Sequence, residues 1–319
     1  MKRCYQMAIR LLLLLVVCMT ASCGKGGATA KKSVSTNTTN VSSGGSSGVT
    51  SSVAPSVLSC PSSAYILIPE NPSLGISAFC VMKYEAKNVS GVAISQPALT
   101  PWVPISQINA KNACTALGVH YDLISNPEWM AIAYNIENVA TNWSSGAVGL
   151  GALFRGHSDN APSASLAVSN SSDPYSNTGN NSSQGMGTGK EQRRILTLSN
   201  GEVIWDFAGN VWEWVDWTLG GDLTLGPTTC SGGPNVELST VNCDALASAD
   251  YLPDNPANLN PVAYGSNYGL GRFQGGIGGA TLRGGAWTND STAGAFALLL
   301  NVVPTFQSVL VGFRCVYRP

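Results

Sequence analysis

The chain has 319 residues, enough for one large domain or two ordinary ones. Charged residues make up 11% of it, against roughly 25% in an average soluble domain, and the formal net charge is −1. The sequence has no basic tail or stripe. A nucleic-acid-binding function is therefore disfavoured, because that binding depends on clustered Lys and Arg side chains facing phosphates.

The first 22 residues have the pattern of a secretory signal. Basic residues precede the apolar run Leu11–Val17, which is far shorter than the roughly 20 residues that span a bilayer. Small residues then lead to Cys23, and this arrangement resembles the lipobox of bacterial lipoproteins, in which the cysteine is lipidated and becomes the mature N-terminus. The family usually has Leu where this chain has Thr20, so ordinary cleavage near Ala21 and a soluble secreted protein are the alternative. We expect an exported protein, lipid-anchored through Cys23 to a bacterial membrane at the outer surface.

Residues 23–57 consist almost entirely of Ser, Thr, Gly, Asn, Val and Ala and have no hydrophobic period, which predicts a flexible tether. A single folded domain is expected over residues 58–319. Beyond the tether the cysteine count is even and no C-x-x-C pair occurs, which favours disulfides over a redox or zinc motif. These cysteines are Cys60, Cys80, Cys114, Cys230, Cys243 and Cys315.

Two strands open the domain, at residues 65–68 and 79–85, with a turn-rich segment between them. A first helix is expected from Ser106 to Leu117, because Ser106 is a good cap and apolar residues recur on one face. A second helix begins at Asn126, which we expect to be its N-cap, with an apolar stripe that starts at Trp129. Both stripes predict packing of the helix on a sheet.

The rest of the chain is rich in Gly, Ser and Asn and has no third clear helix. Residues 160–189 predict a long surface loop, and short strands are expected at 194–198 and 202–207. The predicted fold class is therefore α+β, with two helices against short twisted strands and much irregular loop.

Five short motifs follow one another along the domain: Lys83-Tyr84-Glu85, Asn126-Pro127-Glu128-Trp129, Gly209-Asn210-Val211-Trp212-Glu213-Trp214, Leu282-Arg283-Gly284-Gly285-Ala286-Trp287 and Gly312-Phe313-Arg314-Cys315. In this order they resemble the formylglycine-generating-enzyme (sulfatase-modifying factor) family over roughly residues 60 to 318. The resemblance implies a variant of the C-type lectin fold with antiparallel strands. It also implies a disulfide between Cys114 and Cys315, because a pair joins helix one to the final strand in that family. The pairs Cys60–Cys80 and Cys230–Cys243 are then left by proximity.

Family resemblance does not settle catalysis, because one fold hosts many functions. Catalytic members have a pair of cysteines shortly after the Arg-Gly-Gly-Ser-aromatic motif, which bind copper and activate oxygen, and here residues 288–311 contain no Cys. Related iron enzymes need a cluster of histidines, whereas His120 and His157 lie far apart in the sequence. We expect a structural role for His157 and no enzymatic activity. The alternative is a catalytically active oxidase of the formylglycine-generating type.

The C-terminal segment, about 283–315, resembles more narrowly the variable proteins of diversity-generating retroelements. In those systems a reverse transcriptase copies a template with errors at adenines, so that chosen codons vary while others hold the fold. Gly294, Phe296, Leu298, Asn301 and Pro304 are expected to be fixed. Trp212, Trp214, Trp287 and Phe313 are expected to belong to the buried frame. The ligand-binding, variable positions are expected to be Ala286, Thr288, Asn289, Thr292, Leu299, Val302, Phe306, Ser308 and Leu310.

The alternative for residues 288–311 is ordinary strand and loop. Residues 305–311 are apolar in part and uncharged, so they form an interaction patch if they lie at the surface and none if they are buried. The resemblance also implies a structural calcium at the Gly209–Trp214 turn, held by Asn210, Glu213 and the carbonyl of Val211. Its alternative is a metal-free turn. Otherwise no cofactor is expected, and the expected partner is an extracellular protein or glycan.

Overall fold

The computed structural model describes residues 58–178, 192–218, 230–231, 236–238, 242–243, 246–254, 268–275 and 279–319. The predicted signal, Cys23 and tether lie outside these residues. All the described residues belong to one compact unit, 55–319, and none of its described helices is long and apolar enough to cross a membrane.

A four-stranded sheet joins the two ends of the domain. Its order is β1-β2-β16-β5, and all three pairings are antiparallel. Its strands are β1 (Tyr65–Ile68), β2 (Phe79–Met82), β16 (Cys315–Tyr317) and β5 (Tyr121–Leu123). The predicted strand 79–85 is too long, because the chain bends after Met82 and starts a separate hairpin. There the backbone N–H of Tyr84 donates to Ser95 Oγ. The hairpin consists of β3 (Ala86–Val89) and β4 (Val92–Ser95).

A six-stranded sheet forms the centre of the domain, in the order β10-β12-β14-β13-β8-β15. The pairs β12–β14 and β15–β8 are parallel and the others antiparallel. Its strands are β8 (Trp212–Thr218), β10 (Val236–Glu237), β12 (Arg272–Gln274), β13 (Ala280–Arg283), β14 (Leu298–Val302) and β15 (Val311–Phe313). Two further two-stranded sheets are β6 (Ile195–Thr197) with β7 (Val203–Trp205), and β9 (Cys230–Ser231) with β11 (Asn242–Cys243).

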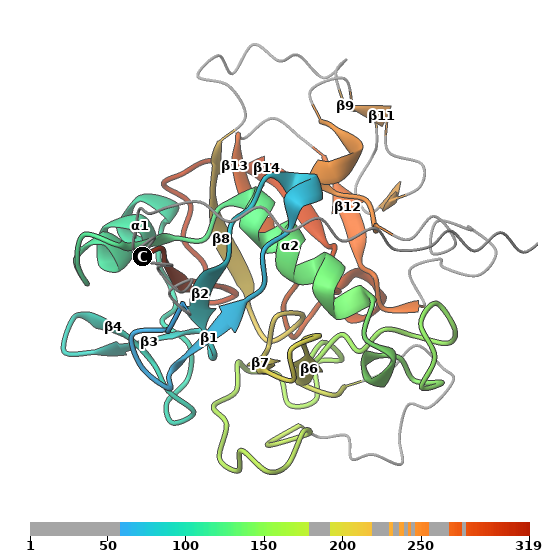
Figure 1. Ribbon diagram of the computed structural model, residues 1–319, viewed down its shortest axis with the longest axis horizontal. Helices are drawn as coiled ribbons and strands as arrows, with labels where there is room; N and C mark the ends of the chain where they lie inside the picture. The colour runs from blue at the N-terminus through green and yellow to red at the C-terminus, as the bar shows by residue number, and fades with distance from the viewer. Residues whose placement is uncertain are drawn as a thin grey trace, which may run out of the picture. The chain divides into compact units, whose positions relative to one another are not determined.

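Two α-helices flank β8, with α1 (Gln107–Thr115) on one side and α2 (Asn126–Glu137) on the other (Figure 1). Ser106 caps α1 as predicted, since its side chain accepts the N–H of Asn109. The predicted cap of α2 is wrong by one residue: Ser125 accepts the N–H of Glu128, whose carboxylate accepts the N–H of Ser125. Short 3-10 helices are η1 (Pro72–Leu74), η2 (Ala140–Asn142), η4 (Ser248–Asp250) and η7 (Asp290–Thr292). The α+β fold class is therefore confirmed.

The core has two main clusters, and neighbouring residues of β14 belong to different ones. Leu298 and Leu300 are buried in the cluster that contains the α2 residues Trp129 and Ile132. Leu299 packs on the cluster that contains Cys114 of α1 and the strand residues Trp212 and Phe313. Successive side chains of a strand point to opposite faces. One face of β14 is therefore fully buried, at Leu298 and Leu300, and the other, at Leu299, lies nearer the surface.

Two disulfides confirm pairings expected from the sequence. Cys114 of α1 is bonded to Cys315 of β16 across 201 residues, and Cys60 is bonded to Cys80 across 20. Cys230 and Cys243 lie opposite each other in the β9–β11 pair. Their side chains lie outside the described part of the structure, so that third pairing stays a prediction.

Loop length predicts which of the two confirmed disulfides stabilises the folded protein more. Closing loops of 201 and 20 residues removes chain entropy worth about 5 and about 3 kcal/mol in the simplest treatment. We predict that Cys114→Ala with Cys315→Ala lowers the free energy of unfolding more than Cys60→Ala with Cys80→Ala. Chemical denaturation of both double variants, with peptide mapping of the unreduced parent, measures this. Equal losses, or a free Cys315 in the map, would contradict it.

Candidate functional site

The C-terminal motif is held by a buried ion pair between Arg314 and Glu213. The guanidinium of Arg314, at the junction of β15 and β16, donates from Nε to Glu213 Oε2 at 2.6 Å and from Nη2 to the other carboxylate oxygen. Further donations reach the carbonyls of Met82 and Trp205, each at 3.1 Å. Both partners of the ion pair are fully buried. The pair therefore ties β8, β2 and β7 to the end of the chain.

A second buried arginine holds the irregular segment that follows His157. Arg194 donates to both carboxylate oxygens of Asp206 at 2.7 Å, and it also donates to the carbonyls of Leu166 and Ala167. The predicted surface loop 160–189 is therefore only partly a surface feature. In its described part, 160–178, Leu166, Val168 and Ser176 are buried.

A third buried arginine joins β13 to the second helix. Arg283 Nε donates to Asn126 Oδ1 at 3.0 Å, and Nη1 donates to the carbonyl of Phe296. Burial lowers the pKa of Arg283 to about 9, the largest cause being desolvation. This use of the Asn126 side chain explains why the neighbouring serine caps α2.

The proposed calcium ligands already have protein partners. Asn210 Oδ1 accepts the N–H of Leu166 at 2.7 Å, and its Nδ2 donates to Glu85 Oε2 at 2.6 Å. Both oxygens of Glu213 accept from Arg314, so a cation at Glu213 would lie beside a guanidinium. Over the described ranges, no group of three His, Cys, Asp or Glu residues could hold a metal ion. The side chains of Asn210 and Glu213 are therefore engaged within the protein, which is the arrangement that the metal-free alternative expects.

The predicted variable positions differ in how exposed they are. Thr288 and Phe306 are exposed, and the exposed fraction of Phe306 is 39%. Ala286 is fully buried in the second cluster, so its assignment as a ligand contact is wrong: a closed core leaves a ligand no access. The remaining predicted positions are half-buried: Asn289, Thr292, Leu299, Val302, Ser308 and Leu310.

Local hydrogen bonds or core contacts anchor most of the half-buried positions. Asn289 Oδ1 accepts the N–H of Ala286 at 2.8 Å, and Ser308 Oγ accepts that of Leu310 at 3.1 Å. Leu299, Val302 and Leu310 pack on the edge of the second cluster. Substitution at these positions therefore changes packing at the edge of the core as well as the composition of the surface.

Sequence reasoning missed exposed apolar residues beside the predicted ones. Val303 has an exposed fraction of 46%, and Ile108 of α1 has 49%. The N–H of Gln107 donates to the carbonyl of Pro304 at 3.1 Å, which places the start of α1 against this loop. A helical-wheel view of Ile108, which falls off the buried stripe of α1, was the available signal.

Expected frame residues are mostly where the sequence places them. Gly294, Phe296, Leu298, Trp212, Trp214 and Phe313 are buried. Asn301 is exposed and Trp287 and Pro304 are half-buried, so their assignment to the buried or fixed frame does not follow from packing. The expected patch at 305–311 is present in part, since Val311 is buried but Phe306 and Val309 are exposed.

Residues 76–319 match the family described as "Sulfatase-modifying factor enzyme 1-like domain". The chain belongs to this family. All five motifs quoted above lie within the matched residues of this sulfatase-modifying factor domain. No curated protein sequence matches the chain.

Solved structures similar to this sulfatase-modifying factor domain include variants of the Major Tropism Determinant and a variable protein of Treponema denticola. The U1 and P3c variants are each 15% identical, with a TM-score of 0.31 over 80% of this chain and 49% of theirs. Treponema denticola variable protein 1 is 15% identical, with a TM-score of 0.30 over 76% of this chain and 85% of its own. The chain thus spans about half the length of the first two.

His157 has a structural position in this sulfatase-modifying factor domain. His157 is fully buried, and its Nε2 donates to the carbonyl of Ala164 at 3.0 Å. Burial is the main cause that lowers the pKa of His157, which keeps the ring neutral. His120 instead lies near the chain end, with Nδ1 2.8 Å from the carbonyl of Arg318. The two rings are therefore held by different parts of the structure.

Glu85 and Glu213 are buried carboxylates near Arg314, and we expect their replacement by Gln to affect the free energy of unfolding in different ways. Burial, followed by the charge of Asp206, raises the pKa of Glu85 from 4.5 to about 8 against the opposing charge of Lys87, whose Nζ lies 3.6 Å from Glu85 Oε2. Folded Glu85 therefore keeps a proton that the unfolded chain releases. Between these values the folded state binds more protons, and stability falls as pH rises. We predict that Glu85→Gln flattens this fall. Glu213→Gln should instead destabilise by about 3–5 kcal/mol, because it leaves Arg314 buried with a weakened partner. Denaturation from pH 5 to 8 tests both, and equal losses in the two variants would contradict the assignment.

Proposed function

We propose that this chain is a ligand-binding protein whose C-terminal segment, 288–310, carries a replaceable binding face on a fixed frame. The observation that supports it most is the contrast within one segment. Leu298 and Leu300 are fully or almost fully buried, whereas Phe306 and Val309, a few residues later, present apolar side chains to solvent. An exposed apolar patch on a firmly held loop is typical of an interaction site.

The frame is suited to tolerate change at its surface. Three buried arginines, Arg194, Arg283 and Arg314, bind backbone carbonyls and acidic or amide partners on other elements. The disulfide Cys114–Cys315 joins the helix next to the face with the last strand. None of these links involves a predicted variable residue. Replacement of Thr288 or Phe306 should therefore leave them intact.

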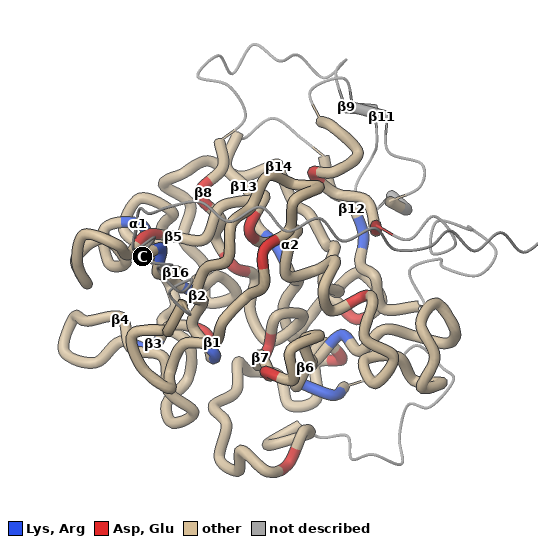
Figure 2. The backbone as a smooth tube through the Cα atoms, in the orientation of Figure 1, with Lys and Arg blue, Asp and Glu red and all other residues tan. Residues whose placement is uncertain are grey.

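The retroelement interpretation explains why buried and exposed positions alternate within the C-terminal segment. A variable protein diversified at chosen codons needs replaceable positions interleaved with fixed ones, and Gly294, Phe296 and Leu298 are buried between Thr288 and Phe306. In this proposal the ligand is an extracellular protein or glycan. Asp290 is the only charged residue of segment 288–310, and charged residues are sparse along the coloured part of the backbone in Figure 2. That composition favours an apolar or hydroxyl-rich partner over a strongly charged one.

Paired libraries test the binding face directly. One randomises Thr288, Asn289, Thr292, Leu299, Val302, Phe306, Ser308 and Leu310. The control randomises four exposed residues elsewhere: Val89, Val92 and Ile94 of the β3–β4 hairpin, and Leu99 after it. Substitutions at Thr288 and Phe306 should cost no more than about 0.5 kcal/mol, and those at Leu299, Val302 and Leu310 about 1 kcal/mol.

Selection against lysozyme, serum albumin and mannan should then yield folded binders from the first library. A control library that yields binders as often, or a first library that is mostly unfolded, would contradict the proposal.

The proposal includes the absence of oxidase chemistry, because no cysteine pair follows Trp287. Incubation of the purified chain with copper and a cysteine-containing sulfatase peptide should give no formylglycine above background, measured by mass spectrometry. A catalytically competent member of the family is the positive control. Turnover comparable to that control would support the alternative function, a formylglycine-generating oxidase.

We also propose that the chain is exported and lipid-anchored through Cys23, on the sequence pattern alone. Metabolic labelling with a clickable fatty acid should tag the parent chain and not Cys23→Ser. Cys60→Ser, which changes a disulfide cysteine of the domain, is the matched control and should still be labelled. Unlabelled parent protein released into the medium would indicate ordinary secretion instead.

A further inference from the structure

Asp290, in the segment that carries the proposed binding face, is paired with a side chain from the interior. Arg155 Nη2 donates to Asp290 Oδ1 at 2.9 Å. The exposed fraction of the side chain is 2% for Arg155 and 62% for Asp290. One partner of this ion pair is therefore part of the buried frame. The other lies at the surface, among positions that the proposed function treats as replaceable.

The buried partner belongs to a loop that the frame holds closely. Gly156 has a φ of 65°, and a Cβ atom there would lie 2.0 Å from the carbonyl oxygen of Ala208. The backbone N–H of Asn210 donates to the carbonyl of His157 at 2.7 Å. The position of Arg155 is therefore set by the turn that precedes β8.

Backbone hydrogen bonds join the same loop to the start of the variable segment. The N–H of Asp290 donates to the carbonyl of Ser158 at 2.6 Å, and the N–H of Asn160 donates to the carbonyl of Trp287 at 2.7 Å. Ser158 is fully buried, and its own N–H donates at 2.8 Å to the amide oxygen of Gln192, which is fully buried as well. Asp290 is thus held to the interior through its main chain as well as through its carboxylate.

The backbone conformation of Asp290 is a second, independent constraint on this position. Its φ is 43°, in the left-handed region that β-branched and bulky residues avoid and that Gly, Asn and Asp tolerate. Proline is excluded because it has no N–H to donate. Asn and Gly satisfy the conformation but not the ion pair, whereas Asp satisfies both.

We propose that Asp290 is a positioning residue of the binding face, which stays constant while its neighbours change. Its ion pair with Arg155 fixes η7, so that Thr288 and Thr292 can be replaced without displacement of the loop that presents them. Loss of the carboxylate would leave a buried guanidinium with a weakened partner, which is strongly unfavourable. The role of the loop rests on the proposed function, but the link between Asp290 and Arg155 is present without a ligand.

Hydrogen exchange measured by mass spectrometry tests the link in the absence of any ligand. Asp290→Asn keeps the shape and the left-handed preference and removes the negative charge. Exchange in peptide 286–294 should become at least about tenfold faster, because the weakened pair favours local opening, and peptide 296–300 should change less. Thr288→Asn, two positions away, should leave both peptides unchanged. No change in peptide 286–294, or an equal change in both peptides, overturns the proposal.

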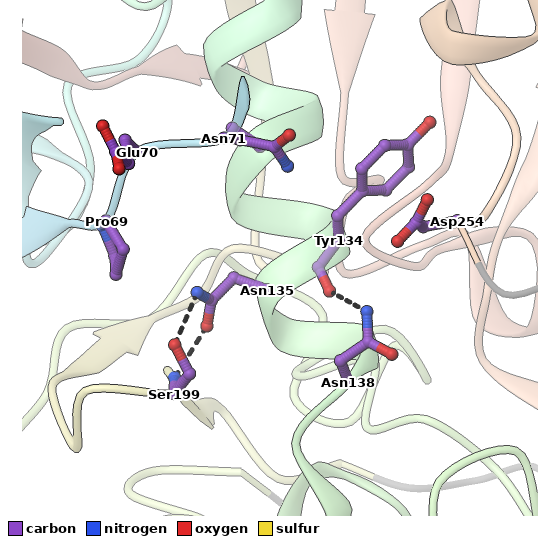
Figure 3. A pocket seen from close by; sticks show the side chains of 9 residues that line it. Pro69, Glu70, Asn71, Tyr134, Asn135, Asn138, Ser199 and Asp254 are labelled. Carbon is purple, nitrogen blue, oxygen red and sulfur yellow. Dashed lines mark hydrogen bonds between the residues drawn. The ribbon is translucent and has the colours of Figure 1, made fainter. Parts of the chain in front are cut away.

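A polar link outside the binding face gives a matched control. Asn135 of α2 and Ser199, which follows β6, bond each other beside a hollow next to the helix, as the dashed lines in Figure 3 show. Asn135 Nδ2 donates to Ser199 Oγ at 2.8 Å, and its Oδ1 accepts the N–H of Ser199 at 2.7 Å. Asn135→Ala should speed exchange around Ser199 and leave peptide 286–294 unchanged.

Binding measurements separate positioning from contact with the ligand. Binders selected from the library of the face against lysozyme, serum albumin and mannan differ in the residues that contact their targets. Asp290→Asn should weaken all of them at least about tenfold, because a loop that is no longer fixed must be ordered on binding. Asn135→Ala should weaken none.

A loss confined to some of the binders would make Asp290 a ligand contact and contradict its role as a positioning residue. A library without binders counts against the proposed function alone, because the exchange experiment still decides whether Asp290 fixes the loop.

Discussion

The fold depends most on the buried ion pair of Arg314 and Glu213. Taking two charges out of water is costly, and such a pair is maintained only when good geometry and further hydrogen bonds satisfy both groups. Here the carboxylate accepts two hydrogen bonds from the guanidinium, which also donates to carbonyls of two other elements. The disulfide at Cys315, one residue further on, fixes the same strand to α1. The last strands of the chain are thereby held from both sides.

This fixed end determines where the surface can change. The segment between β13 and β15 begins after Arg283 and ends at β15, which Arg314 directly follows. Because both arginines are held by buried hydrogen bonds, the two ends of the segment are fixed in position. Within it, residues that face the α2 cluster are locked by packing, because emptying a buried aliphatic position costs about 2–5 kcal/mol. Residues at the edge of the α1 cluster tolerate more. Within this segment, the positions that can change without loss of packing therefore lie on that edge and on the loop around Phe306.

The sequence predicted the helices, the α+β class and two disulfides well. Capping serines, apolar stripes and motif order are local or short-range signals, and the family resemblance added the long-range pairing of Cys114 with Cys315. It failed where one side chain had a choice of partners. Asn126 was taken as a cap but binds Arg283. Ala286 was assigned to the surface although the fold buries it, because no sequence pattern shows which side of a Gly-Gly turn faces the core.

The claim that this protein combines a fixed frame with a replaceable face is tested most directly in the DNA around its coding sequence. We expect a near-copy of the repeat that encodes the last residues, close to a reverse-transcriptase gene and differing from it at adenines. The differences should fall on codons of exposed or edge positions such as Thr288 and Phe306, and none should fall on Phe296, Leu298 or Arg314. Absence of such a repeat, or differences spread equally over the buried codons, would contradict the account.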